Sequence, residues 1–377
     1  MEPPYDTNKL NRLMDKAGID LILAHTPHNI RYLTGGYYFH FRERITAIGP
    51  SQYLPFVGIP KGDTTRAFQV AWLVEACPYN KIEDWIPDIV HTKARGTVGA
   101  AQIAAKAIRN RGLTKATIGI ERAFMPADAM DMLRKELPEA HFVESFNTLE
   151  ELRIIKRPNE IEIFRRAGQA DAEAIQEGFL LGPKDVTTER IARTVEGGMV
   201  KRGLHFHYVF TAAGPSMRRD PSEKIWKPGE ILHIDAGGSQ MGYMADICRM
   251  GSRGKPSPLA DELHKACLHV LNKTRAAMEP GVACGTIYRI GQAALEETGY
   301  AESGIFDIHG IGMVQQELPR FNLDEERPLE SGMIVSLEND IRYPEIGFVK
   351  IEDAVAIVKG GCEGLGDLGR DIWGCLD

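Results

Sequence analysis

The chain has 377 residues, a net charge of −7 at neutral pH and a pI of about 5.9. This length exceeds one ordinary hydrophobic core and predicts two domains. Apolar residues make up 43% and charged residues 26%, which is typical of a soluble globular protein. No basic stripe occurs, so nucleic acid is an unsuitable partner. The scattered cysteines, the N-terminus without a signal-peptide pattern and the lack of a long apolar run predict a cytoplasmic protein with reduced thiols and no membrane contact.

The first part of the chain alternates between helical and strand-like patterns. Apolar side chains recur at helical spacing from Asn8 to Ala17, and Asp20 to Ala24 is a short apolar strand. Further helices and a strand are predicted at Thr97–Asn110, Pro126–Leu137 and Thr117–Glu121. This alternation predicts an α/β layer domain, which we place at residues 1–153.

The segment from Leu152 to Glu162 predicts a domain boundary followed by a long helix. Pro158 fits the first turn of a helix but not its interior, and Asn159 or a neighbour could cap it. The second domain, at residues 154–377, is predicted to be α+β, with paired helices against an antiparallel sheet. Its further helices and strands are predicted at Thr187–Arg202, Leu259–Met278, Gly285–Thr298, His207–Ala212, Ile231–Ala236 and Tyr243–Met250. The glycine-rich stretch from Gly360 to Gly369 is predicted to be a loop.

Two aspartates lie in neighbouring apolar segments. Asp235 and Asp246 are separated by Gly237, Gly238 and Gly242, which permit a tight hairpin. A hairpin would bring the two carboxylates together, and buried carboxylates repel each other unless a cation lies between them. The pair alone is equally consistent with a metal site and with two aspartates that flank a turn.

Three further candidate ligands follow along the chain. His309 opens a His-Gly-Ile-Gly motif whose glycines let the backbone approach a ligand, although a His in a glycine turn is the simpler interpretation of the motif alone. Glu338 and Glu352 end apolar β-rich segments, where a buried glutamate needs a partner. Four carboxylates and one imidazole suit Mn²⁺, Co²⁺, Fe²⁺ or Zn²⁺, and two such ions if a carboxylate bridges them.

The order of these residues resembles the pita-bread enzymes, which include prolidase, aminopeptidase P, methionine aminopeptidase and creatinase. The shared order is an Asp, a second Asp eleven residues later, His-Gly-Ile-Gly and then two Glu. The Leu152–Glu162 segment resembles the start of their catalytic domain, and Asn29–Gly35 resembles the N-domain signature of the prolidase and creatinase branch. The resemblance implies helices around a curved antiparallel sheet, preceded by a smaller creatinase-like α/β domain.

The same resemblance implies a role for each candidate ligand. One metal ion would be held by Asp235, Asp246 and Glu352, and the other by the set Asp246, His309, Glu338 and Glu352. It also makes Glu338 and His309 the candidates for catalytic residues. The expected cofactor is therefore a pair of divalent ions.

Several positions depart from the peptidase pattern. In the peptidases one His usually follows the strand that ends here at Gly214, and another stands where this chain has Gln316. In addition, Asn339 replaces a usual Pro and Lys350 replaces a usual Arg. The imidazoles that would donate to a peptide carbonyl are therefore missing, and the loss of one such donor costs about 10²–10³ in rate. We expect peptide hydrolysis by the usual route to be impaired.

A small set of polar residues could contact a substrate. His207 alternates with His205 on a predicted strand and could point into the site, although a packed His is the simpler interpretation. Arg218 and Arg219 lie where the first missing His would fall, and Arg binds carboxylates with two hydrogen bonds, although an exposed ion pair is an alternative. The substrate-binding candidates are Arg42, Arg44, His207, Arg218 and Gln316.

The segment from Tyr37 to Arg44 is rich in aromatic and basic residues, types that are enriched at interface hot spots. In the relatives this region overhangs the active site of a dimer partner. The resemblance thus implies a homodimer in which Arg42 or Arg44 clamps a substrate carboxylate across the interface.

Three functions compete at this point. The leading one is a metal-dependent hydrolase of the Xaa-Pro peptidase family that cleaves a C–N bond in a small amide, imide or dipeptide-like carboxylate. The second is a metal-dependent lyase. The dimethylsulfoniopropionate lyase branch resembles this chain in lacking those His residues and in carrying Lys near the last Glu. Ectoine-type ring opening is a further reaction of the family. The third is a non-catalytic peptide-binding module, which the complete ligand set disfavours. A creatinase reaction fits poorly, since creatinase works without metal.

Overall fold

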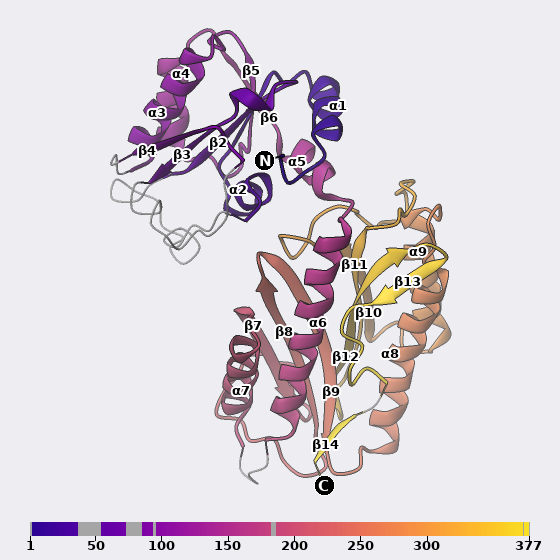
Figure 1. The fold of residues 1–377 in the computed structure, drawn as a ribbon. Coiled ribbons are helices and arrows are strands. Elements are labelled where there is room, and N and C mark those ends of the chain that lie inside the picture. Colours follow the sequence, from indigo (N-terminus) through magenta and orange to yellow (C-terminus); the bar gives the residue numbers. More distant parts are fainter. Residues whose placement is uncertain are drawn as a thin grey trace. The chain divides into compact units, whose positions relative to one another are not determined.

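The computed structural model describes residues 2–36, 54–72, 85–92, 96–181, 186–371 and 373–376. The chain divides into two compact units, Met1–Arg153 and Ile154–Asp377 (Figure 1). Each unit is built around its own sheet. None of the helices in the described ranges is long and apolar enough to cross a membrane.

The first unit is an α/β layer. Its elements are α1 (Thr7–Ala17), β1 (Leu21–Ala24), α2 (Pro27–Thr34), β2 (Phe56–Pro60), η1 (Thr64–Arg66), β3 (Phe68–Trp72), β4 (Asp88–Thr92), α3 (Gly96–Asn110), β5 (Thr117–Ile120), α4 (Ala127–Glu136), β6 (His141–Glu144) and α5 (Phe146–Arg153). The strands form a mixed sheet in the order β4-β3-β2-β1-β5-β6. Small alanines such as Ala100 and Ala104 on α3 pack with Leu21 and Ile118 of the sheet, so the helix and sheet form one apolar core.

The Asn29 signature of the first unit has a structural explanation. Glu121 is completely buried and accepts hydrogen bonds from the backbone N–H groups of His25 at 2.8 Å and Thr26 at 3.0 Å. The side-chain amide of Asn29 also donates to Glu121 through Nδ2, and Arg153 donates to Oδ1 of the same side chain. These contacts fix the start of α2 against β5 and α5, because a buried carboxylate must be fully hydrogen-bonded.

The second unit places helix pairs against an antiparallel sheet. Its elements are α6 (Pro158–Phe179), α7 (Thr188–Lys201), β7 (His205–Ala213), β8 (Ile231–Gln240), β9 (Tyr243–Arg253), α8 (Pro258–Ala277), α9 (Cys284–Glu297), β10 (Gly304–Gly310), β11 (Ile334–Tyr343), β12 (Gly347–Val358), β13 (Gly361–Gly364) and β14 (Gly374–Leu376). The main strand order is β10-β11-β12-β9-β8-β7, and β14 pairs in parallel with β9. Helices α6 and α7 pack on β7–β9, and α8 and α9 pack on β10–β12 (Figure 1).

Two local expectations are corrected by the structure. The glycine-rich stretch is not wholly a loop, because Gly361–Gly364 forms β13 along the part of the β12 edge that β9 leaves free. Pro158 does occupy the first turn of α6, but the N-cap is Arg157 rather than Asn159. The Glu160 carboxylate accepts a hydrogen bond from the Arg157 backbone N–H at 2.8 Å and completes a capping box.

The alternation of side chains along the strands explains where the polar residues point. On β12, Val349 and Ile351 belong to the apolar core under α8 and α9, so Lys350 and Glu352 leave the opposite face. On β8, Ile234 belongs to the core under α6 and α7, and Asp235 leaves the opposite face. The face of the sheet without helices therefore collects polar side chains from neighbouring strands.

The helix-side face of β12 carries one buried charge cluster of its own. Asp353 is completely buried and its carboxylate contacts Arg370 Nε at 2.6 Å, Arg249 Nη1 at 3.2 Å and Arg275 Nη1 at 3.2 Å. These arginines come from the loop after β13, from β9 and from α8. The cluster ties three separate segments to the strand that carries Glu352.

Candidate metal centre

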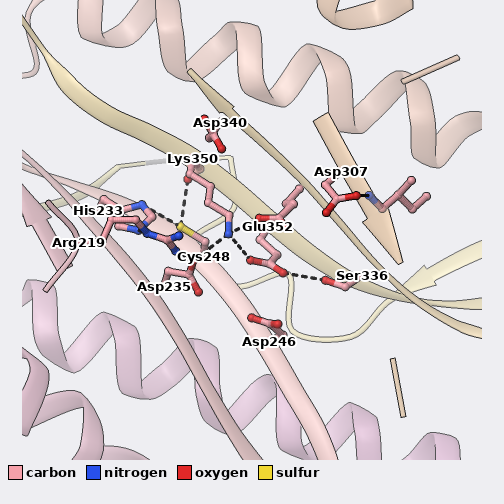
Figure 2. A network of polar contacts seen from close by, with 12 residues as sticks. Arg219, His233, Asp235, Asp246, Cys248, Asp307, Ser336, Asp340, Lys350 and Glu352 are labelled. Carbon is pink, nitrogen blue, oxygen red and sulfur yellow. Dashed lines mark hydrogen bonds and ion pairs between the residues drawn. The ribbon is translucent and has the colours of Figure 1, made fainter. Parts of the chain in front are cut away.

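The polar face gathers all five ligands that the sequence predicts. They come from five strands: Asp235 from β8, Asp246 from β9, His309 from β10, Glu338 from β11 and Glu352 from β12. The turn at Met241 and Gly242, both with positive φ, closes β8 and β9 into the expected hairpin. Glu338 lies directly opposite Glu352 in the β11–β12 pairing. Segments far apart in the sequence therefore meet in one site (Figure 2).

Asp246, His309 and Glu352 form a group that suits a metal ion. One donor atom from each residue lies within 4.8 Å of the others. Burial and the neighbouring Asp235 raise the pKa of Asp246 to about 6. Burial, Asp246 and Glu338 raise the pKa of Glu352 well above its usual range. The positive charge around these two carboxylates is too small to keep both of them ionised. A divalent ion would relieve their mutual repulsion.

The Lys350 ammonium group lies on the other side of the site, among three carboxylates. Its Nζ atom is 2.8 Å from Asp235 Oδ2 and 2.7 Å from Glu352 Oε2 (Figure 2). It also contacts Glu338. The Lys350 side chain is only 5% exposed. Although burial alone would lower the pKa of Lys350, the surrounding carboxylates raise it well above its ordinary value. The chain thus supplies a positive charge to the site itself.

Asp235 has a second cationic partner. Arg219 forms an ion pair with Asp235, and its Nε atom is 3.3 Å from His233 Nε2. The Arg219 guanidinium lies over the rings of Phe210 and Phe348, at 4.8 and 5.2 Å from their centroids, and these rings fix its position. Burial raises the pKa of Asp235. Lys350, His233 and Arg219 together lower it by a larger amount, so the net shift of the pKa is downward.

A second group of donor atoms also lies next to Asp235. His233, Asp235 and Cys248 have donor atoms within 4.8 Å of one another, and His233 Nδ1 is 3.4 Å from Cys248 Sγ. Burial lowers the pKa of His233 to about 3, so the ring is neutral. Arg219 and Lys350 both contact Asp235, however, and two positive charges beside this group oppose the binding of a metal ion there.

Asp246 and Glu352 have neutral hydrogen-bond donors that the sequence did not reveal. Tyr208 donates to Asp246 Oδ1, and Gln315 Nε2 donates to Asp246 Oδ2 at 2.9 Å. Ser336 Oγ donates to Glu352 Oε1 at 3.0 Å. Outer donors of this kind orient metal-binding carboxylates. The alternation of Ser336 with Glu338 on β11 was the one available signal for Ser336.

One further acid approaches the site from the helix side. Asp171 of α6 is completely buried, and neither of its carboxylate oxygens has a hydrogen-bond partner in the described part of the chain. Burial, Asp246 and Asp235 raise its pKa well above the usual range, although Arg249 opposes the shift. Asp171 is therefore stabilised as the neutral acid.

Two of the predicted substrate contacts, Arg218 and His207, have polar partners of their own. Arg218 is 86% exposed and pairs with Asp220 at 3.5 Å, whereas its neighbour Arg219 reaches Asp235. His207 is exposed, and its Nε2 atom is 2.9 Å from Ser239 Oγ.

Gln316 and the two N-domain arginines complete the set of predicted contacts. Gln316 is exposed, whereas the preceding Gln315 contacts Asp246. Arg42 and Arg44 lie outside the described residues. The roles of these residues in substrate binding stay predictions.

The comparisons with known proteins place this site in a family. Residues 162–359, more than half of the chain, match metallopeptidase family M24. The chain belongs to this family. Residues 7–155 match the creatinase/prolidase N-terminal domain. Family M24 membership makes the chain a metal-dependent hydrolase and confirms the predicted fold class, a pita-bread catalytic domain after a creatinase-like domain.

Relatives of this M24 chain extend over nearly its whole length. The Xaa-Pro dipeptidase of Lactobacillus helveticus is 26% identical, with 97% of each chain covered. Among solved structures, an Xaa-Pro dipeptidase from Bacillus anthracis has a TM-score of 0.82 at 23% identity, covering 98% of this chain and 99% of that one. The prolidase from Pyrococcus horikoshii OT3 has a TM-score of 0.78 at 24% identity, covering 96% and 97%. At these identities the solved structures show a shared fold.

Proposed function

We propose that this chain hydrolyses a C–N bond in a small amide, imide or dipeptide-like substrate that carries a carboxylate. The observation that carries the proposal is the buried Asp246, His309 and Glu352 group, whose donor atoms lie within 4.8 Å of one another. These residues would hold a divalent ion. When bound, such an ion polarises a carbonyl oxygen and lowers the pKa of a bound water.

The native ion is proposed from the chemistry of the donors. Carboxylates dominate the site and a single imidazole joins them, which suits Mn²⁺, Co²⁺, Fe²⁺ or Zn²⁺. The five-ligand set predicts up to two ions, but the proposed hydrolysis requires only the ion at Asp246, His309 and Glu352. The hydrolysis does not require an ion next to Asp235, where Lys350 and Arg219 already contact the carboxylate.

Glu338 is our candidate for the group that accepts a proton from the attacking water. Its side chain is 21% exposed, so it is more accessible than the nearly fully buried Asp235 and Glu352. Lys350 contacts Oε2, which leaves Oε1 for a water or substrate. The Lys350 contact also holds the Glu338 carboxylate toward the site.

Arg219 is the candidate for binding the substrate carboxylate. It is 32% exposed, and the Phe210 and Phe348 rings hold its guanidinium at the edge of the site. A guanidinium has five N–H donors, more than the contacts with Asp235 and His233 use. Of the two arginines that the sequence suggested for this role, Arg218 and Arg219, we therefore propose Arg219.

Metal-dependent assays would test the proposed function. Protein loaded with Mn²⁺ or Co²⁺ would be incubated with dipeptides, cyclic amides and N-acyl amino acids, and hydrolysis would be followed by mass spectrometry. We expect a product that has gained water, and no product from Asp246→Ala. A product formed by elimination, without water, would instead support the lyase. Protein with neither bound metal nor turnover of any substrate would support the peptide-binding module.

We also propose that the chain is a homodimer whose first unit helps to close the partner's site. The support is the match of residues 7–155 to the creatinase/prolidase N-terminal domain and the aromatic and basic sequence from Tyr37 to Arg44. Mixing an Arg42→Ala/Arg44→Ala variant with Asp246→Ala would restore part of the activity if sites are shared. Mixed dimers without activity would refute the contribution in trans, and a monomer by sedimentation would refute the dimer.

A further inference from the structure

We infer that Lys350 takes the place of a second metal ion, so that the chain binds one divalent ion where its ligand set predicts two. The inference rests on the proposed function, since it assumes that Asp246, His309 and Glu352 hold an ion. It concerns the position that the resemblance assigns to Asp235, Asp246 and Glu352, where Lys350 contacts both Asp235 and Glu352. There the chain's own ammonium group supplies the charge that an ion would otherwise bring.

The Lys350 contacts occupy the oxygen atoms that a second ion would need. Nζ lies 2.8 Å from Asp235 Oδ2 and 2.7 Å from Glu352 Oε2, and it also contacts Glu338. A metal ion bound by these oxygens would lie about 2.0–2.2 Å from them, and so in almost the same position as Nζ. The ammonium and a second ion therefore exclude each other.

Burial also holds the Lys350 side chain in this position. It leaves β12 on the same face as Glu352, two residues away, and is only 5% exposed. Moving the ammonium aside would place a positive charge in a buried setting without these three carboxylates. Leaving a buried charge unpaired is strongly unfavourable.

The charge balance points to a single ion. Asp235, Asp246, Glu338 and Glu352 carry four negative charges when ionised, and Lys350 and Arg219 neutralise two of them. The two that remain equal the charge of one divalent ion. A second ion would leave a buried site with excess positive charge.

The two sides of the site differ in the kind of partner they have. Asp235 has two cationic partners, Lys350 and Arg219. The partners of Asp246 are neutral donors, Tyr208 and Gln315, which orient its carboxylate without cancelling its charge. The position for an ion is therefore the Asp246 side.

The stoichiometry of bound metal tests the inference. The full-length protein would be saturated with Mn²⁺, freed of excess ion, and analysed for metal per chain by mass spectrometry and for Mn²⁺ coupling by electron paramagnetic resonance. We expect one ion per chain with the signal of an isolated Mn²⁺. Two ions per chain, or a spin-coupled pair, would overturn the inference and leave the proposed function standing. A chain that binds no ion would overturn both.

Variants separate Lys350 from the rest of the site. Lys350→Ala is expected to raise the ratio from one ion to two, whereas the wild-type chain keeps one. The matched control Lys265→Ala removes an exposed lysine and should also keep one. A ratio that stays at one in Lys350→Ala would refute the role of Lys350.

A second variant guards against misfolding of Lys350→Ala. Asp235→Asn removes a ligand of the excluded position but leaves Asp246, His309 and Glu352 intact. It is expected to keep one ion per chain, as judged on protein whose circular dichroism matches the wild type. Loss of the ion in Asp235→Asn would show that Asp235 is a ligand and would overturn the inference.

Discussion

Lys350 Nζ lies 2.7 Å from Glu352 Oε2, and the two residues are separated by one position on β12. Because alternate residues of a strand share a face, a single strand provides both a predicted metal ligand and a counter-charge for it. This pairing divides the polar face into two parts. On one side the chain neutralises its own carboxylates, and on the other it leaves them for an ion.

Substitution of the ligands on the Asp246 side should abolish metal binding. Asp246→Ala and Glu352→Ala each remove one of three donors in the group, and we expect near-complete loss of bound metal in both. The measurement is metal per chain after dialysis, with the exposed Glu302→Ala as a control that keeps the ion. Full metal content in both variants would contradict the assignment of the site.

The protein should be slow on Xaa-Pro dipeptides. Gln316 stands where the peptidases usually have a His, and the segment after Gly214 places Arg219, not an imidazole, against the site, so the two usual imidazole donors are replaced. The loss of one such donor costs about 10²–10³ in rate. Steady-state assays of the metal-loaded protein would check this, and a turnover near about 10 s⁻¹, as in ordinary enzymes, would show the expectation to be wrong.

The neutral donors to Asp246 should strengthen metal binding. Tyr208→Phe and Gln315→Met each remove one hydrogen bond to the Asp246 carboxylate. Loss of an outer donor typically weakens metal affinity about 10–100-fold. Calorimetric titration with Mn²⁺ would measure the change, and Gln316→Met is a matched control because the adjacent side chain is exposed. Equal affinities for Gln315→Met and Gln316→Met would count against this role.

Acid should destabilise the second unit in part through His264. Burial lowers the pKa of this ring from 6.5 to about 4, and its centroid lies 4.6 Å from that of Trp373. As the pH falls below 6.5, the unfolded chain takes up a proton that the folded chain refuses. Stability is therefore present above pH 6.5 and is lost as the pH falls toward 4, by an amount on the order of 3 kcal/mol.

Urea unfolding at several pH values, with a chelator present, would measure the contribution of His264. The variant His264→Phe retains a ring against Trp373 but cannot take up a proton, so its stability should vary less between pH 6.5 and 4. The exposed His269→Phe serves as the control and should keep the wild-type dependence. If His264→Phe loses stability as steeply as the wild type, another group is responsible.

The five candidate ligands could be selected from the sequence because each of them lies in a regular pattern. Asp235 and Asp246 flank a glycine hairpin, and Glu338 and Glu352 lie on strands whose alternation fixes their face. Lys350 was recognised only as a departure from the family. Its contact with Asp235 crosses from β12 to β8, two neighbours away in the sheet, and no local pattern reports such a contact.

Two contacts with the site lie one position away from a substrate-binding candidate, and both have a common cause. Arg219 rather than Arg218, and Gln315 rather than Gln316, reach the site. Both pairs lie in irregular segments between strands, where no periodicity tells which side chain turns inward. The register shift of β7 between Phe206 and Tyr208 likewise interrupts the alternation of side chains along the strand. A β-bulge changes the face that each residue presents, so alternation from His205 did not predict the Tyr208 contact.

The Asp353 cluster has a consequence for how this scaffold tolerates change. Three arginines from different segments hold Asp353 on the helix-side face of β12, while Glu352 faces the site. The anchoring of the strand and the chemistry of the site are thus assigned to opposite faces of the same backbone. We expect exchanges on the open face, such as lysine for arginine at position 350, to alter the number of ions while the anchoring contacts stay in place. A fold organised in this way can diversify its reactions without rebuilding its core.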